Sequence, residues 1–251
     1  EWGTGEPAIG FLGEYDALAI HFNEMTGRIQ SLIQLNYEAT LRTQSAELKQ
    51  LQAQINPHFL YNSFFLLRHM IGQEEGAQAE CLAEHLGRYF QYLVRQEEDV
   101  LPLAREVDHA LSYVSIQRMR FGDFLQADIA PLPDRYAQVR TPRLILQPLF
   151  ENAMEYGVPT GNDLAVVRLS YLEADGLLIL RVEDNGDRLS DERLAALQAL
   201  LQARDAPGDS HALLNIHRRL IIFAGQSCGL RLSRSPLGGL RIDVVLHLSK
   251  G

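Results

Sequence analysis

Cysteine, long hydrophobic runs and clustered basic residues are all scarce in this 251-residue sequence. The two cysteines, Cys81 and Cys228, lie far apart and lack metal-ligand spacing, which excludes a disulfide framework and indicates a reducing compartment. No run of about 18 apolar residues occurs, and no signal-peptide pattern opens the sequence. The net charge of −9 and the absence of any Lys/Arg-rich window exclude a nucleic-acid surface.

The rest of the composition is that of an ordinary globular chain of one or two domains, with 46% hydrophobic and 22% charged residues. The first residue is Glu1 rather than Met. We therefore expect an excised portion of a longer protein, whose membrane or sensing part is missing.

A long helical pattern with almost no glycine or proline runs from about Glu14 to Ile71. Within it, Leu41, Leu48 and Ile55 recur at seven-residue spacing, which predicts a coiled-coil seam. A helix this long cannot bury its apolar stripe alone. The pattern therefore predicts a partner helix, most simply from a second copy of the chain.

The segment GQEEG at residues 72–76 breaks this pattern, and a second amphipathic helix is predicted over about 77–96. Two helices joined by a short turn pack as an antiparallel hairpin. Two such hairpins, one from each copy of the chain, would form a four-helix bundle. This part of the sequence predicts a helical dimerisation domain.

A mixed α and β pattern follows, so we place a domain boundary near residue 101. The predicted helices cover about 103–121, 142–156, 190–204 and 212–224. The predicted strands cover about 124–129, 164–172, 177–183, 229–235 and 239–248. The expected fold class is α+β, with a helical dimerisation hairpin followed by an α/β sandwich.

The segment QINPHFLYN at residues 54–62 places a proline directly before a histidine in the long helical pattern. A proline in a helix interior costs about 3 kcal/mol, so we expect a kink at Pro57 that turns His58 outwards. Asn62 lies four residues on, where its amide can bond a ring nitrogen of His58. The histidine is either a core residue or a nucleophile for a phosphoryl group, which imidazole accepts near neutral pH.

Two short motifs in the second half carry polar groups suited to a nucleotide and its metal. In PRLILQPLFENAMEYG, Glu151 and Asn152 supply the oxygen ligands that hard cations prefer. In LLILRVEDNGDRLS, an apolar strand runs into Asp184, Asn185 and Gly186. Taken singly, the first motif is also typical of a solvated helix face and the second of a turn.

The order of these pieces, with the helix LLNIHRRL and the final strand after LGG, resembles the catalytic domain of the GHKL ATPases. The segments QINPHFLYN and LPLAREVDHALSYVSIQRMRF are similar to sensor histidine kinases of the LytS/YesM type. The segment EYDALAIHFNEMTGRIQSL looks like the second helix of a HAMP module. The resemblance implies a partial HAMP-like segment (1–35), a dimerisation and phosphoacceptor domain (36–100) and a GHKL-type ATP-binding domain (101–251).

The resemblance also implies roles for individual residues. His58 would be autophosphorylated, with Asn62 beside it, and Glu151 would order a metal-bound water or assist transfer. Asn152 would coordinate the Mg²⁺ that bridges the phosphates of ATP. Asp184 would accept a hydrogen bond from the adenine amino group, and Gly186 would let the backbone pass close to the base. The other implied cofactor-binding residues are Gly157, Asn185, Asn215, Gly238 and Gly239.

The implied partners are a second copy of the chain, ATP and a response regulator whose aspartate takes the phosphoryl group, with no nucleic acid. The implied location is the cytoplasmic portion of a bacterial inner-membrane protein, in contact with the membrane only through the missing N-terminal segments.

Several positions depart from the family pattern, and they keep alternatives open. At three positions where glycine is common in the family, this sequence has another residue. These residues are Ser210, Ala212 and Arg188, which follows Asp187. Side chains at such positions obstruct the approach of backbone N–H groups to phosphates. An active kinase is the preferred interpretation. A dimeric signalling scaffold with an impaired ATP site is the alternative, and a plain GHKL ATPase leaves QINPHFLYN unexplained.

Overall fold

The computed structural model describes Met25, Arg28 and residues 56–94, 99–156, 164–202 and 212–248. The chain divides into two units, residues 1–57 and residues 58–251, and the elements discussed below belong to the second, apart from Pro57 at the start of the first helix. The predicted coiled-coil seam and the HAMP-like segment lie outside the described residues, apart from Met25 and Arg28. No helix in the described ranges has the length and hydropathy that crossing a bilayer would require.

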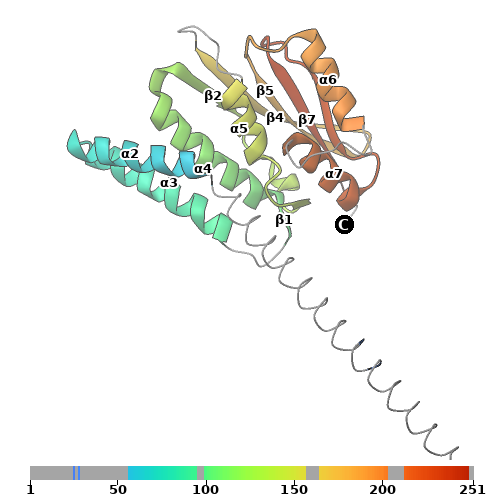
Figure 1. The fold of residues 1–251 in the computed structure, drawn as a ribbon, viewed down its shortest axis with the longest axis horizontal. Coiled ribbons are helices and arrows are strands. Elements are labelled where there is room, and N and C mark those ends of the chain that lie inside the picture. Colours follow the sequence, from blue (N-terminus) through green and yellow to red (C-terminus); the bar gives the residue numbers. More distant parts are fainter. Residues whose placement is uncertain are drawn as a thin grey trace, which may run out of the picture. The chain divides into compact units, whose positions relative to one another are not determined.

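Helices α2 (Pro57–Gly72) and α3 (Gly76–Val94) form the predicted hairpin, and the break between them is confirmed as a turn. They lie side by side in Figure 1. The predicted apolar face of α3 is confirmed, since Leu82, Leu86, Tyr89 and Leu93 are buried. The helix α3 also packs against α4 (Leu103–Phe121), so the hairpin shares a core with the following elements. The predicted domain boundary near residue 101 stays a prediction.

The expected kink at Pro57 is replaced by a helix start. Asn56 is not helical, and Pro57 is the first residue of α2. At this position the missing N–H of proline has no intrahelical partner to lose, and its fixed φ suits the first helical turn. The proline therefore opens the helix that carries His58.

A five-stranded mixed sheet forms the second half, with strand order β2-β4-β5-β7-β6. The first pair is parallel and the other neighbours are antiparallel. The strands are β2 (Leu125–Ile129), β4 (Ala165–Ala174), β5 (Leu177–Asp184), β6 (Gly229–Arg234) and β7 (Leu240–His247). The helices that contact it are α4, α5 (Gln147–Tyr156), α6 (Asp191–Gln202) and α7 (Ala212–Ala224). The expected α/β sandwich is confirmed in this layered form.

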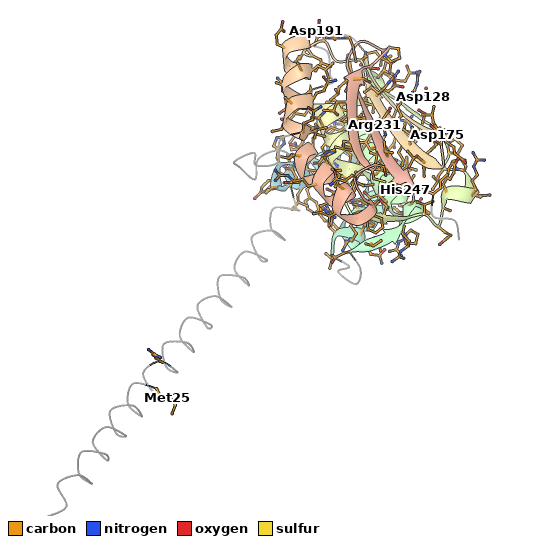
Figure 2. The ribbon with its side chains drawn as sticks, turned by 90° about the vertical axis from the view of Figure 1, so that its right-hand side faces the viewer. Met25, Asp128, Asp175, Asp191, Arg231 and His247 are labelled. Carbon is orange, nitrogen blue, oxygen red and sulfur yellow. The ribbon has the colours of Figure 1, made fainter. Side chains whose placement is uncertain are left out.

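The two faces of the sheet differ in polarity. Alternate residues of β5 and β7 are buried, among them Leu178, Leu180 and Val244, each with 0% exposure. On the other face, Arg181 and Glu183 of β5 form ion pairs with Asp243 and Arg241 of β7, and Arg168 of β4 forms one with Asp128 of β2. In Figure 2, Arg231 marks β6, His247 marks the end of β7, and Asp191 marks the start of α6. One face therefore builds the core and the other is polar.

A two-residue turn fixes the register of the central hairpin. Asp175 and Gly176 join β4 to β5 with φ values of 53° and 74°. Positive φ at both central residues is typical of the type I′ turn, for which Asp-Gly is a favoured pair. Ala174 then pairs with Leu177, and the register carries β5 to Asp184 at its end.

Two local predictions needed correction. The strands β1 (Val100–Pro102) and β3 (Arg140–Pro142) pair antiparallel and were not predicted. The helix predicted from Pro142 begins at Gln147 instead, because residues 140–142 join this small sheet and Leu144 has a φ of 54°. A residue with positive φ cannot continue a right-handed helix.

Candidate nucleotide and phosphoacceptor site

A buried carboxylate holds the backbone that leads into α5. Glu106 of α4 is fully buried, and its two oxygens accept hydrogen bonds from the N–H groups of Leu144, Ile145 and Leu146 at 2.7–2.9 Å. The Tyr92 hydroxyl donates to the same carboxylate. Burial raises the pKa of Glu106, and these hydrogen bonds lower it in part. The strained backbone at Leu144 is thereby fixed, and α5 starts in a defined direction.

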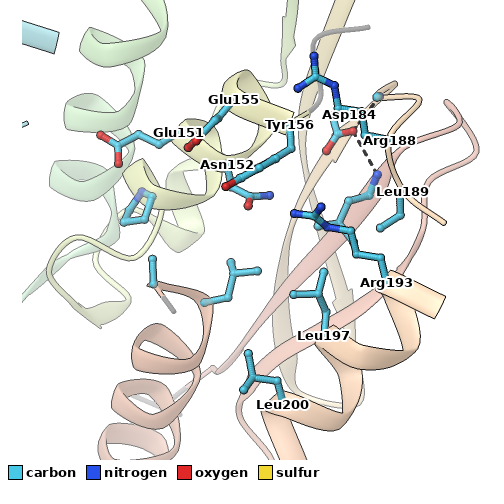
Figure 3. Close-up of a pocket in the computed structure, with 15 residues that line it drawn as sticks. Glu151, Asn152, Glu155, Tyr156, Asp184, Arg188, Leu189, Arg193, Leu197 and Leu200 are labelled. Carbon is cyan, nitrogen blue, oxygen red and sulfur yellow. Dashed lines mark hydrogen bonds between the residues drawn. The ribbon is translucent and has the colours of Figure 1, made fainter. Parts of the chain in front are cut away.

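Helix α5 presents the polar residues of the ENA motif at one cavity. Glu151 is partly buried, and its Oε1 accepts a hydrogen bond of 2.8 Å from Nε2 of Gln147. Burial raises the pKa of Glu151, as does the charge of Glu155, while the bond from Gln147 opposes the rise. Asn152 lies one residue further along the helix and lines the same cavity. Figure 3 shows both side chains extending from α5.

Asp184 lies opposite α5, at the end of β5, in a tight backbone turn. Its Oδ1 accepts hydrogen bonds from the N–H groups of Gly186 at 2.9 Å and Leu240 at 3.2 Å. Gly239 passes so close that a Cβ there would lie 1.9 Å from Asp184 Oδ1 and 2.5 Å from Gly186 N. Burial raises the pKa of Asp184, and the two backbone hydrogen bonds lower it in part. Only glycine fits at residue 239 while this turn is kept.

The side chains of α5, β5 and α6 enclose a cavity of about 320 Å³. Its polar lining combines three carboxylates with two guanidinium groups, from Glu151, Glu155, Asp184, Arg188 and Arg193. Leucines from α6, α7 and the neighbouring loops complete it, and these are Leu189, Leu197, Leu200, Leu213 and Leu240. A cavity with an apolar wall and a few charged groups suits a flat base joined to phosphates.

Arg193 extends from α6 across this cavity. Its guanidinium lies 5.1 Å from the ring centre of Tyr156, the last residue of α5 (Figure 3). Such a cation–π contact holds the guanidinium over the ring and keeps it near the polar end of α5. Positive charge therefore reaches the cavity from two side chains, Arg188 and Arg193.

His58 lies on the outer surface of the hairpin. Its side chain is exposed, so the interpretation as a core histidine is wrong. The amide nitrogen of Asn62 lies 3.2 Å from each of its two ring nitrogens, as expected from their spacing on the helix. Neighbouring Phe59 is buried and anchors the helix face that leaves His58 outside. An exposed, hydrogen-bonded imidazole is accessible to a phosphoryl donor.

The other implied cofactor-binding residues that the structure describes, Asn185, Asn215, Gly238 and Gly239, do not line the cavity. The side chain of Asn185 bonds the backbone at the start of β4, accepting from Val166 N at 2.7 Å and donating to Leu164 O at 2.9 Å. Asn215 is exposed on α7, and Gly238 has a φ of 116° in the turn before β7. Gly157 and Ser210 lie outside the described residues, whereas Ala212 begins α7 and lines the cavity.

The donor set fits a magnesium–nucleotide complex. Among the described residues there is no group of three or more His, Cys, Asp or Glu side chains that would cage a metal ion. Mg²⁺ needs no such cage, because it takes one or two protein oxygens and completes its shell with water and phosphate. The amide of Asn152 and the carboxylate of Glu151 supply oxygens of this kind.

Three residues of this site were not predicted from the sequence. They are Glu106, which fixes the backbone before α5, Gln147, which holds Glu151, and Arg193, which faces Tyr156. The glutamine lies four residues before Glu151 in LQPLFENA, but its other partners come from α3 and α4. A pattern along one chain carries no signal for such distant pairs.

Comparison with known proteins finds a matching family model and several relatives of this chain. A family model described as Histidine kinase matches residues 46–125. Sensor histidine kinase YesM of Bacillus subtilis is 31% identical over 226 residues, which cover 90% of this chain and 37% of that protein. Sensor protein LytS of Bacillus anthracis is 30% identical over 209 residues, covering 83% and 35%. The chain thus spans about a third of the length of these relatives.

Among solved structures, the ATP-binding domain of PrrB from Mycobacterium tuberculosis is 19% identical, with a TM-score of 0.40. The match covers 60% of this chain and 98% of that one. A score this low leaves the fold assignment to the strand order and the helices described above.

Proposed function

Because the chain belongs to the sensor histidine kinases of the LytS/YesM type, we propose that it transfers the γ-phosphoryl group of ATP to His58. A response regulator's aspartate then takes the group from the histidine. The observation that carries the proposal is the single cavity lined by Glu151, Asn152 and Asp184. In this cavity Asp184, the proposed base-binding residue, lies opposite Asn152, the proposed metal-binding residue, and both belong to the same unit as the exposed His58.

The nucleotide is held from both ends of the cavity. Two backbone N–H groups occupy Oδ1 of Asp184, so its Oδ2 accepts from the adenine amino group. The leucine side chains of the lining cover the base. At the polar end, Asn152 would hold Mg²⁺ through its side-chain oxygen, and the ion would supply charge neutralisation at the phosphates.

Transfer depends on positioning and on charge neutralisation, as in other phosphoryl transfers. Arg188 and Arg193 add positive charge at the cavity. We assign to them part of the phosphate contact that glycine-rich backbone provides in the family pattern. The Asn62 amide bonds the His58 ring and holds its orientation. The attacking ring nitrogen forms the P–N bond while the bond from the γ-phosphorus to the leaving oxygen of ADP breaks.

A homodimer completes the proposed kinase. The outward face of α2 exposes Tyr61 by 75%, Phe64 by 56%, Phe65 by 64% and Ile71 by 63%. The first three recur at helical spacing and form a contiguous apolar stripe next to His58. Pairing of two hairpins along this stripe would form the four-helix bundle. The segment before α2 would carry signals from a membrane-bound part to this bundle.

Labelled ATP tests the proposal. The purified chain is incubated with γ-labelled ATP and Mg²⁺, beside His58→Gln and a matched control, His69→Gln, which changes another exposed histidine of α2. We expect acid-labile, base-stable label on the wild type and the control, and none on His58→Gln.

The other outcomes separate the alternatives. Phosphate release that does not depend on His58 indicates a plain ATPase. The absence of both label and Mg-ATP binding indicates a signalling scaffold, which the replacement of a family glycine by Ala212 at the cavity would favour.

A further inference from the structure

We propose that Gln147 is a positioning residue that fixes the Glu151 carboxylate and joins it to the hairpin carrying His58. The inference rests on the proposed kinase function and adds a residue to it. Gln147 opens α5 and is 5% exposed. No phosphate or base needs to contact it for the role described here.

The side-chain amide of Gln147 has partners on three helices. Its Nε2 donates to the Tyr89 hydroxyl of α3 and to Glu151 Oε1 of α5, both at 2.8 Å. Its Oε1 accepts from His109 Nε2 of α4 at 2.6 Å. Both amide protons and the oxygen are thus used. A flipped amide would place its oxygen against the Glu151 carboxylate, so the network has one stable orientation.

The histidine in this network is fixed as a neutral donor. Burial lowers the pKa of His109 to about 4. Its ring lies between Tyr92 at 4.0 Å and Tyr89 at 5.0 Å, in stacked geometry with both. Its Nδ1 is buried and has no hydrogen-bond partner, which is consistent with the proton residing on Nε2, towards Gln147. The amide of Gln147 is therefore held from α4 as firmly as from α3.

Tyr89 connects this network to the phosphoacceptor helix. Its ring centre lies 4.9 Å from that of Phe59, the residue next to His58 on α2. Phe59 also lies 5.2 Å from Tyr113 of α4. Phe59 and Tyr89 are almost fully buried, so a shift of α2 relative to α4 must displace them. The path from the hairpin to the nucleotide site runs through Phe59, Tyr89, Gln147 and Glu151.

The test compares Gln147→Leu with Gln117→Leu. Gln117 is likewise a glutamine with 5% exposure, but its amide donates to the Tyr113 hydroxyl at 2.7 Å rather than to Glu151. The first readout is the position of the Glu151 side chain in a crystal structure of each variant. We expect Gln147→Leu to release the carboxylate from the place where it accepts the 2.8 Å bond, and Gln117→Leu to leave it there.

The second readout is autophosphorylation of His58 at saturating Mg-ATP. Gln147→Leu should lower kcat about tenfold or more with little change in KM. Tyr89→Phe keeps the bond to Glu151, so its kcat should fall less than that of Gln147→Leu.

An unmoved Glu151 carboxylate in Gln147→Leu overturns the positioning role, whether or not phosphoryl transfer occurs. A displaced carboxylate without any label on wild-type His58 supports the positioning role and contradicts the proposed kinase function. Equal effects of the two leucine variants on kcat and KM also overturn the role, since they reduce it to packing.

Discussion

Replacement of Glu106 by glutamine tests how the entrance to α5 is held. The carboxylate accepts three backbone N–H bonds and one from the Tyr92 hydroxyl. A glutamine side chain keeps one of the two oxygens. Its NH₂ group takes the place of the other oxygen and faces the Tyr92 hydroxyl and the N–H of Leu144, both of which are donors. The Tyr92 hydroxyl can turn to accept from it, but the N–H of Leu144 cannot, and it is left buried without an acceptor.

The expected cost follows from these contacts. An unpaired buried N–H costs about 1–3 kcal/mol, and the bonds that remain lose the charge that strengthened them. Relief of a buried charge offsets part of this loss. We expect Glu106→Gln to lower the free energy of unfolding by about 2–3 kcal/mol, which corresponds to a fall in Tm of about 4–12 °C for a chain of this size.

Thermal and urea unfolding at one fixed protein concentration measure the effect, because a dimer would make stability concentration-dependent. Asp108→Asn is the matched control, since Asp108 lies on the same helix but is exposed. Mg-ATP affinity, measured well below the transition, should also fall because α5 carries Asn152. A Glu106→Gln variant as stable as Asp108→Asn would refute the assigned role of the carboxylate.

Three further predictions concern the cavity and pH. Gly239→Ala puts a Cβ 1.9 Å from Asp184 Oδ1 and so disturbs the turn that holds this carboxylate. Calorimetry should show that the variant binds Mg-ATP at least about tenfold more weakly than the wild type. A variant that binds Mg-ATP with the wild-type affinity would contradict this. Arg193→Ala should raise the Kd of Mg-ATP about three- to tenfold, and the effect should be smaller at high salt. The control Arg231→Ala, at an exposed position of β6, should leave the Kd unchanged. Equal Kd values for the two variants would contradict a phosphate contact of Arg193. Burial lowers the pKa of His109 to about 4 in the folded chain, whereas its unfolded pKa is about 6.5. The neutral ring therefore stabilises the fold fully above pH 6.5. This contribution, about 3 kcal/mol in all, is lost as the pH falls towards 4. Urea unfolding from pH 7 to 4 should show a flatter stability profile for His109→Gln, and parallel profiles would exclude the effect.

Local patterns sufficed for most elements of the second half. The helices predicted over about 77–96 and 103–121 and the strands predicted over about 164–172 and 177–183 rest on patterns among neighbours in sequence, and the structure has helices and strands there. His58 and Asn62 meet because a helix brings residues four apart onto one face. Asn152 of the ENA motif and Asp184 of the DNG motif line the same cavity, as the family resemblance implies.

What the sequence did not reveal depends on distant pairs. Glu106 meets the backbone of Leu146 across 40 positions, and Gln147 meets Tyr89 across 58. The small β1–β3 sheet likewise pairs Leu101 with Thr141. Because of these contacts, α5 starts at residue 147 rather than at residue 142, which the sequence predicted. No periodicity marks them, because each involves one polar side chain or a three-residue strand.

The position of the phosphoryl group on the chain is the most direct measurement of the central claim. After incubation with Mg-ATP, the protein is digested at alkaline pH and its peptides are sequenced by mass spectrometry. The account predicts one phosphoryl group on the imidazole of His58. Phosphorylation of a different residue, or an unmodified His58 in protein shown to bind Mg-ATP, would contradict it.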